Sequence, residues 1–375
     1  MIKEGIIKHF KKIGDKRDTK NQKHNFLEII VMTICAVCSG CDNYGEITQF
    51  CRIKQTWFGR FLKLKNGIPS HDTFNRVIGS IDPEQFEKCF AEWVRAVHTI
   101  SKGQVVAIDG KTVRGSKNGK TKAIHMVSAW ANANKLVLGQ VKTEEKSNEI
   151  TTIPELLEIL EISGCIVTID AMGCQKDIVE KLLKKGADYV LAVKGNQSSL
   201  HEDIQLFFKD ALPSKMKDIA HDYYKTIEKD HGRIEKREYY TTSDVEWLKK
   251  RHGEWKNLQS IGIAKSTVQL GERTREDIRF YISSLDADAK QFGKAVREHW
   301  GIENSLHWVL DVAFREDANR VRKDNSAENF AVIRHIALNL IKQDSSKESI
   351  KNKRKRCSYD DDFRYKVIFG SNKSI

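Results

Sequence analysis

The sequence predicts an α/β protein with a mixed sheet, preceded by an all-helical region and interrupted by a β-rich insertion. Three observations predict this class. Residues 1–98 carry helical periodicity throughout. After residue 103, three short runs rich in β-branched residues are followed by alternating helix and strand patterns. From about 213 to 285 strand patterns return, before helices resume at 289.

Length and composition bound the class of protein. At 375 residues the chain exceeds one ordinary core, so two or three domains are expected. Its 64 Lys and Arg against 51 Asp and Glu leave a formal charge of +13, and the pI is near 9.2. This excess favours polyanionic partners such as nucleic acid. A basic globular protein with no such partner is the alternative.

The longest apolar run of the helical region, Phe26 to Cys38, contains Glu28 and is shorter than the ~20 residues that span a bilayer. The lysine-rich residues before it lack the apolar stretch of a secretion signal. We therefore expect a cytoplasmic protein without a membrane partner. Because the cytoplasm is reducing, we expect the eight cysteines to be reduced thiols. In "CAVCSGC", Cys35, Cys38 and Cys41 suggest a metal site, but no fourth ligand stands at a recognisable offset, and buried helix cysteines are the preferred reading.

The third helix of the amino-terminal region follows a break at Gly67 and Pro69, and Ser70 or Asp72 can cap it. Its apolar residues fall at helical spacing and its polar residues face outwards: Phe74, Val77, Ile78 and Ile81 against His71, Asn75 and Arg76. Two short helices, a glycine-containing turn and this helix predict either a DNA-binding helix-turn-helix or an ordinary helical bundle.

Two aspartates stand at the predicted ends of apolar strands. Asp109 ends "VVAID" and Asp170 ends "CIVTID". Functional groups gather at the carboxyl ends of strands in α/β sheets, so both acids are candidates for one site, although either could simply cap the next turn. Clustered carboxylates repel unless a cation lies between them, and oxygen-only ligands select Mg²⁺ or Mn²⁺. Two such ions can activate a nucleophile and stabilise the leaving oxygen at phosphorus.

A third carboxylate, Glu303, lies in "HWGIENSLHW" between His299 and His307. On a regular helix the three side chains share a face, but the ~1.5 Å rise per residue separates the two histidines by roughly 12 Å. One zinc ion could bind Glu303 with either histidine and hardly all three. Glu303 is therefore a candidate for the aspartate site, a surface acid paired with a neighbouring cation, or half of a zinc site. The flanking tryptophans are expected to pack and fix the helix.

Five motifs in order resemble the DDE transposases of bacterial insertion sequences, in the ISAs-type branch with the H-repeat-associated proteins: "AIDGKTVRGS", "TIDAMGCQKDI", "YVLAVKGNQ", "HGRIEKRE" and "HWGIENSLHWVLDVAFREDANRVR". The resemblance implies an RNase H-like catalytic domain in which Asp109, Asp170 and Glu303 are catalytic and hold two Mg²⁺ or Mn²⁺ ions. It implies cleavage and strand transfer on double-stranded DNA, at terminal inverted repeats and target sites, by a homodimer or larger assembly.

One departure concerns a Tyr-x2-Arg-x3-Glu-x6-Lys signature of the wider superfamily. The matching positions here hold Val296, His299 and Leu310, so phosphate-gripping roles do not carry over. The candidate DNA contacts, which include possible substitutes, are Lys111, Arg114, Lys194, Asn196, His231, Arg233, Arg237, Arg297 and His299.

The expected organisation is a helical DNA-binding domain at 1–98, the catalytic domain at 103–343 with its insertion at about 213–285, and a basic tail at 344–375. The run "KESIKNKRKRC" in that tail is expected to be a solvated or phosphate-contacting arm. Two alternatives to an active transposase are a decayed copy that only binds DNA and a zinc hydrolase built on His299 and Glu303.

Overall fold

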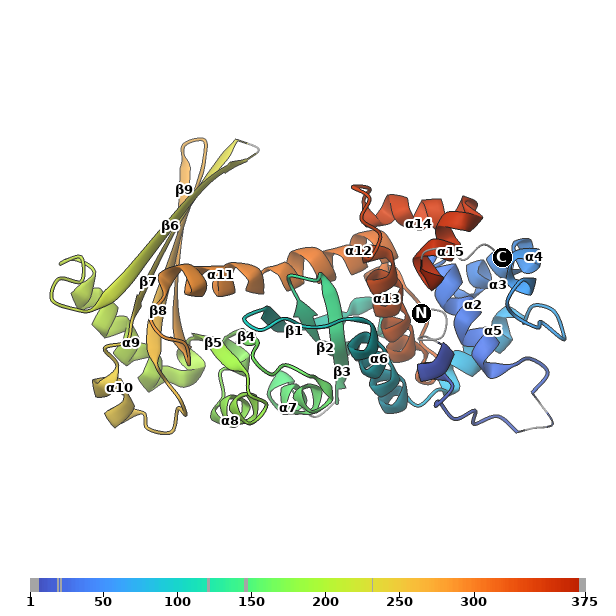
Figure 1. The fold of residues 1–375 in the computed structure, drawn as a ribbon, viewed down its shortest axis with the longest axis horizontal. Coiled ribbons are helices and arrows are strands. Elements are labelled where there is room, and N and C mark those ends of the chain that lie inside the picture. The colour runs from blue at the N-terminus through green and yellow to red at the C-terminus, as the bar shows by residue number, and fades with distance from the viewer. Residues whose placement is uncertain are drawn as a thin grey trace.

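The computed structural model describes residues 7–18, 20, 22–119, 122–144, 148–230 and 232–370. The molecule is elongated, with a helical region at one end, a sheet in the middle and long β-hairpins at the other end (Figure 1). No helix in the described ranges is long and apolar enough to cross a membrane.

A nine-stranded mixed sheet runs in the order β3-β2-β1-β4-β5-β9-β8-β7-β6, which confirms the predicted class. Its strands are β1 Val105–Val113, β2 Ile124–Ala131, β3 Leu136–Thr143, β4 Ile166–Ile169, β5 Asp188–Val193, β6 His221–Asp230, β7 Arg233–Thr242, β8 Ser260–Leu270 and β9 Arg273–Ser283. The first three strands form the expected antiparallel meander, and β4 and β5 continue it in parallel with β1. Strand β9 pairs with β5, so the insertion extends the same sheet.

Helices cover both faces of the central strands (Figure 1). On one face lie α7 Glu149–Ile159 and α8 Lys176–Lys184, and across the other runs α11 Ala289–His299, which packs on β1 and β4 and on the insertion. A π-helical turn, η5 Glu303–His307, joins α11 to α12 Trp308–Phe314. Helix α9 Ser198–Ala211 lies between β5 and the insertion, and α10 Glu246–Arg251 lies in the insertion between β7 and β8. The acid-bearing strands therefore lie directly beneath the helix that leads to Glu303.

The amino-terminal region is helical, as predicted, with α2 Phe26–Cys38, α3 Tyr44–Ile53, α4 Gln55–Gly59, α5 His71–Ser80 and α6 Pro83–Val97. The long helix α13 Ser326–Lys342 packs against α2, α5, α6 and strand β3. In α5, His71 and Arg76 are exposed, whereas Asn75 is half-buried and accepts a hydrogen bond from Ser326. Of the three residues of α5 predicted to face outwards, Asn75 therefore contacts α13 instead.

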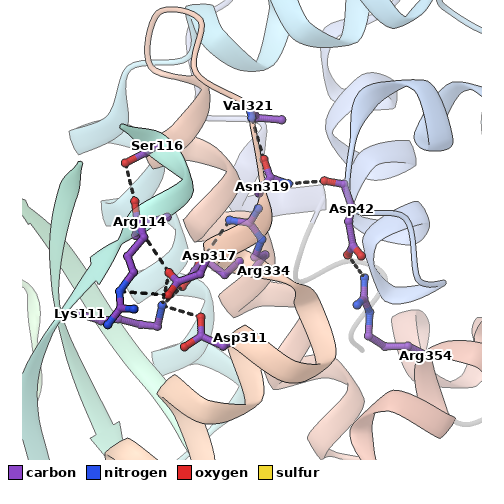
Figure 2. Close-up of polar contacts among 12 residues, drawn as sticks. Asp42, Lys111, Arg114, Ser116, Asp311, Asp317, Asn319, Val321, Arg334 and Arg354 are labelled. Carbon is purple, nitrogen blue, oxygen red and sulfur yellow. Dashed lines mark hydrogen bonds and ion pairs between the residues drawn. The ribbon is translucent and has the colours of Figure 1, made fainter. Parts of the chain in front are cut away.

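The basic tail is not a free arm over residues 350–369, which corrects the prediction. These residues form α14 Ile350–Tyr359 and α15 Asp361–Phe369, and both helices pack on α2. Arg354 is buried, donates to the carbonyl of Val37 and pairs with Asp42 at 2.8 Å (Figure 2). Arg364 lies over the Trp57 ring with its guanidinium carbon 4.0 Å from the centroid. Arg354 and Arg364 fold inwards because carbonyls and aromatic rings accept their charge.

Candidate active site

The sheet register brings Asp109 and Asp170 together. Strands β1 and β4 are parallel with Ile108 opposite Ile169, so the aspartates that follow are neighbours on the same face. Asp170 directly follows β4, as predicted. Asp109 does not end its strand: β1 continues to Val113 because β2 still pairs with it as far as Ile124. Asp109 therefore extends from a rigid strand at the point where the neighbouring strand β4 stops.

The site opposes the ionisation of both aspartates. Burial raises the pKa of Asp109 to about 7, and the charges of Glu149, Asp170 and Glu303 add to the effect, although the backbone N–H of Gly110 opposes it. Burial and Glu149 likewise raise the pKa of Asp170, against hydrogen bonds from the chain and the charge of Lys194. Carboxylates brought together in this way bind a proton or a cation.

Asp170 also caps a turn, which was the alternative reading of this residue. Its Oδ1 accepts hydrogen bonds from the backbone N–H of Met172 at 3.0 Å and of Gly173 at 3.4 Å. Both bonds use the same oxygen. The cap therefore orients the carboxylate without using its second oxygen.

Glu303 begins the π-helical turn and its side chain is exposed. Its charge raises the pKa of Asp109, which places it in electrostatic range of the aspartates. Over the described part of the chain, no three His, Cys, Asp or Glu side chains converge closely enough to hold a metal ion. The π-turn also breaks the regular 100° spacing that we assumed for this helix, because it adds a residue to one turn.

The two histidines beside Glu303 point to different places. His299 Nδ1 lies 3.1 Å from Thr168 Oγ1, and burial lowers its pKa to about 4. His307 Nδ1 lies 3.6 Å from Asp109 Oδ2, and burial lowers its pKa to about 3. A neutral imidazole cannot attract phosphate by charge, and His299 is engaged with Thr168, so its contact with DNA remains a prediction. The two rings contact different residues, Thr168 and Asp109, and no three-ligand metal group in the described residues includes either of them.

The flanking tryptophans differ from each other. Trp300 is half-buried under the Arg279 guanidinium, whose carbon lies 4.4 Å from the ring centroid. Trp308 is 61% exposed. The expectation that both rings fix the helix by packing therefore holds only for Trp300, since Trp308 faces solvent while Val309 and Leu310 after it are buried.

Lys111, predicted to contact DNA, is instead enclosed by acids from α12 and the loop after it. Its Nζ lies 2.8 Å from Asp311, 3.1 Å from Glu316 and 3.2 Å from Asp317 (Figure 2). Burial opposes its charge, but these carboxylates hold its pKa above the usual value. Lys111 thus ties β1 to the segment that follows Glu303, and it is not free for a phosphate.

Three predicted arginines line a cavity of about 450 Å³ between α11 and one face of the insertion. Arg237 is buried there, at 3.0 Å from Glu228 and 2.5 Å from Glu235. Arg233 and Arg297 are exposed and pair with Glu235 and Glu228. Arg275, Arg279 and Lys265 add charge, so the lining carries six cations against Glu235 and Asp277. The cavity ends at Trp300 and Asn304, beside Glu303.

The remaining predicted contacts lie around the strand ends. Lys194 is exposed, and Asn196 donates to the carbonyl of Ala171 at 2.7 Å, so it braces the turn after Asp170. The Arg114 side chain is 82% exposed and lies 3.6 Å from Asp317. His231 lies outside the described residues.

Sequence reasoning missed four residues of this site. Glu149 begins α7 and its charge acts on both aspartates, and His125 on β2 contacts it at 2.7 Å. Arg279 and Trp300 form the stacked pair in the cavity. The available signal for Glu149 was its place at a helix start, after the third strand, as the acid next to the capping Asn148.

The donor chemistry of the site fits a divalent cation. Asp109, Asp170, Glu149 and Glu303 supply only oxygen ligands, and their mutual repulsion is what such a cation relieves. The exposed Glu303 is the member that would have to close on the others.

Comparison with known proteins covers nearly the whole chain. A family model described as "Transposase DDE domain" matches residues 100–340, and one described as "DDE_Tnp_1-associated" matches residues 7–94. The "Putative transposase YncI" of Escherichia coli O157:H7 is 45% identical over 94% of this chain and 91% of that protein. The "H repeat-associated putative transposase YhhI" of Escherichia coli strain K12 is 41% identical over 98% and 99%. The "Inactive transposase YbfQ" of that strain is 32% identical over 20% of this chain and 87% of its own length.

Proposed function

Because the chain belongs to the DDE transposases, a family that generally uses divalent metal ions and acts on DNA, we propose that it is the active transposase of a bacterial insertion sequence. It binds the terminal inverted repeats of its element, hydrolyses a phosphodiester to free a 3′-hydroxyl, and joins that hydroxyl to target DNA. The observation that carries this proposal is the pair of partly buried, mutually repelling aspartates, together with a basic cavity that reaches Trp300 and Asn304, the neighbours of Glu303 in α11–η5.

Asp109, Asp170 and Glu303 are the proposed catalytic residues and would hold two Mg²⁺ or Mn²⁺ ions. Such ions supply positive charge for the attacking and leaving oxygens at phosphorus. The rigid β1–β4 pair fixes the two aspartates, and the acids around Lys111 hold β1 to the segment after Glu303. We propose that Glu303 turns towards the aspartates when the ions bind.

The DNA lies, in this proposal, along the basic cavity and the strand ends. Arg233, Arg297 and Arg279 contact phosphates, and Lys194 and Arg114 contact the backbone beyond the aspartates. The division into a helical DNA-binding region at 1–98 and a catalytic region at 103–343 stands as part of the proposal, with the tail helices α14 and α15 added to the first. We propose a dimer or larger assembly on DNA, since two ends must be held together, and a cytoplasmic place of work.

The test is cleavage of a labelled fragment that carries the inverted repeats flanking the gene. Asp109→Asn should bind the fragment as the wild type does, and should lose Mg²⁺-dependent cleavage by at least ~100-fold, since loss of a ligand exceeds the effect of an outer residue. Asp210→Asn, an exposed acid on α9, is the matched control.

Undiminished cleavage by Asp109→Asn would refute the catalytic assignment. Binding without cleavage by the wild type would identify a decayed copy that only occupies DNA ends; one short relative is named an inactive transposase.

A further inference from the structure

Asn132, in the turn between β2 and β3, connects the strand of Asp109 with the helix that leads to Glu303. Its backbone N–H donates to the carbonyl of Val105, the first residue of β1, at 3.2 Å. Its half-buried side chain contacts the end of α11. A single residue therefore joins the two elements that carry the first and the third acid of the proposed site.

The Asn132 amide has one orientation in these contacts. Its Nδ2 donates to the carbonyl of Glu298, next to the last residue of α11. Its Oδ1 accepts from the indole Nε1 of the buried Trp130 at 3.2 Å. Because an indole N–H only donates and a main-chain carbonyl only accepts, the amide cannot be turned round without losing both bonds. The sheet thus fixes the amide, and the amide fixes the helix.

Gly301 allows this close approach. A Cβ at residue 301 would overlap Oδ1 of Asn132. The amide could move aside only by breaking its bond to Trp130 or to the carbonyl of Glu298. The glycine in "HWGIENSLHW" is therefore needed for the contact between the helix end and Asn132, two residues before Glu303.

The contact lies on the face of the sheet to which Asp109 points. Trp130 on β2 and Thr168 on β4 are both opposite Ala107. Side chains alternate along a strand, so these two residues share a face with Asp109, two positions after Ala107. Helix α11 covers that face, since its last residue, His299, contacts Thr168. Asn132 therefore holds the helix on the side of the sheet where the glutamate is needed.

Glu303 lies between two attachments of its helix to the sheet. Asn132 holds the segment before it, and the ion pair of Lys111 with Asp311, at 2.8 Å, holds the segment after it. Glu303 itself is exposed on the π-turn between them. The attachments set where its main chain stands relative to Asp109, while its side chain remains free to turn.

We propose that Asn132 is a positioning residue for Glu303, which sets the place of this glutamate relative to the strand of Asp109. The inference rests on the proposed function, because it concerns how the same site is assembled. Its consequence is that the loss of one amide N–H in the β2–β3 turn slows DNA cleavage without weakening DNA binding.

The experiment is single-turnover cleavage of the labelled fragment by the full-length protein in Mg²⁺. Asn132→Ala should lower the rate constant by about 10- to 100-fold, the usual cost of removing a residue that orients a ligand from outside, and should leave the affinity for the fragment unchanged. Asn134→Ala is the matched control, because Asn134 lies in the same turn but donates to the carbonyl of Thr99. It should cleave like the wild type.

Asn132→Asp isolates the bond to the helix. The aspartate keeps the shape and can still accept from Trp130, but it has no N–H for the carbonyl of Glu298. It should slow cleavage as Asn132→Ala does. Loss of folded protein would lower the amplitude of the single turnover, whereas misplacement of Glu303 lowers its rate constant. A wild-type rate constant in the folded fraction of either variant would overturn the proposal.

Gly301→Ala tests the same contact from the helix side. The added Cβ should displace the Asn132 amide and slow cleavage. Asn132→Ala removes the atoms that this Cβ would overlap, so the double variant should cleave no more slowly than Asn132→Ala alone. Losses that multiply in the double variant would mean that the two residues act separately, which contradicts the proposal.

Hydrogen exchange provides a readout that is independent of cleavage. In the DNA-free, metal-free protein, the amides of residues 300–307 should exchange faster in Asn132→Ala than in the wild type, and no faster in Asn134→Ala. Unchanged exchange in Asn132→Ala would overturn the inference.

Asp109→Asn distinguishes the two levels of failure. If Asp109→Asn loses cleavage while Asn132→Ala cleaves like Asn134→Ala, only this inference fails. If Asp109→Asn cleaves like the wild type, or the wild type does not cleave, the proposed function fails. Hydrogen exchange then decides alone whether Asn132 positions Glu303.

Discussion

Strand β1 presents Asp109 and Lys111 on one face, and acidic residues surround each of them. The negative charge around Lys111 is compensated within the protein, whereas that around Asp109 is not. Around Lys111, the carboxylates of Asp311, Glu316 and Asp317 are neutralised by an internal cation, and Arg334 lies 3.3 Å from Glu316 (Figure 2). Around Asp109, burial and, after it, the neighbouring acids leave the carboxylate with a raised pKa, and the pKa of the adjacent His307 is lowered by burial. The first cluster is a structural clamp, and the second has the character of a site for an external cation.

The largest expected effect comes from removing the internal cation. Lys111→Met should lower the free energy of unfolding by about 3–5 kcal/mol, because it removes the cation shared by the buried Glu316 and the partly buried Asp311 and Asp317. Urea denaturation measures this, with the exposed Lys117→Met as the control. A loss below about 1 kcal/mol, the range of an exposed ion pair, would mean that the two clusters are not different in kind.

The second prediction concerns pH in the absence of metal. A pKa of about 7 in the folded state, against the ordinary 3.8, means that the folded protein binds a proton that the unfolded chain releases. In chelator, the free energy of unfolding should therefore fall as pH rises from about 4 to about 7, by up to about 4 kcal/mol from this group, and level off above.

The difference between the wild type and Asp109→Asn isolates this contribution from other groups that titrate. Urea denaturation of both proteins at several pH values measures it. A difference that stays constant between pH 4 and pH 7 would contradict an uncompensated Asp109.

The smallest effect is stabilisation by added cation. At Mg²⁺ concentrations near 100 times the dissociation constant, the wild type should gain about 2.7 kcal/mol. Asp109→Asn should gain much less at the same concentration, and Asp210→Asn should gain as much as the wild type. Equal stabilisation of the wild type and Asp109→Asn in thermal unfolding would place the bound cation elsewhere.

The sequence predicted the elements whose hydrophobic period is clear and missed those that depend on polar residues. The meander, α7, α8 and the amino-terminal helices all follow apolar spacing. Strand β6 has the sequence "HDYYKTIEKD", which carries too little apolar alternation to indicate a strand on its own, and its pairing with β7 stabilises it. Helices α14 and α15 were hidden by their basic residues, although Ser349 and Asp360 are N-caps that could have been recognised.

The site was predictable where it depends on strands and unpredictable where it depends on tertiary contacts. Asp109 and Asp170 followed from two apolar runs. The burial of Lys111 did not, because its partners lie about 200 residues away. The π-turn at Glu303 leaves no mark in the hydrophobic pattern, and the repeated His-Trp pair does not by itself show that Trp308 is exposed. The position of Glu149 against the main chain at Gly110 was not predictable either, because the two residues meet only in the folded protein.

The inward-folded tail has a consequence for synthesis. Helix α2 packs on α3, α5 and α13, and it completes its packing against α14 and α15, which are made much later in the chain. Domains generally fold as they emerge, amino-terminal first, but part of the α2 surface must wait for these two helices. A frameshift or early stop near residue 345 would uncover the face of α2 that they bury, so a truncated gene copy should yield a destabilised amino-terminal region and not merely a tail-less protein.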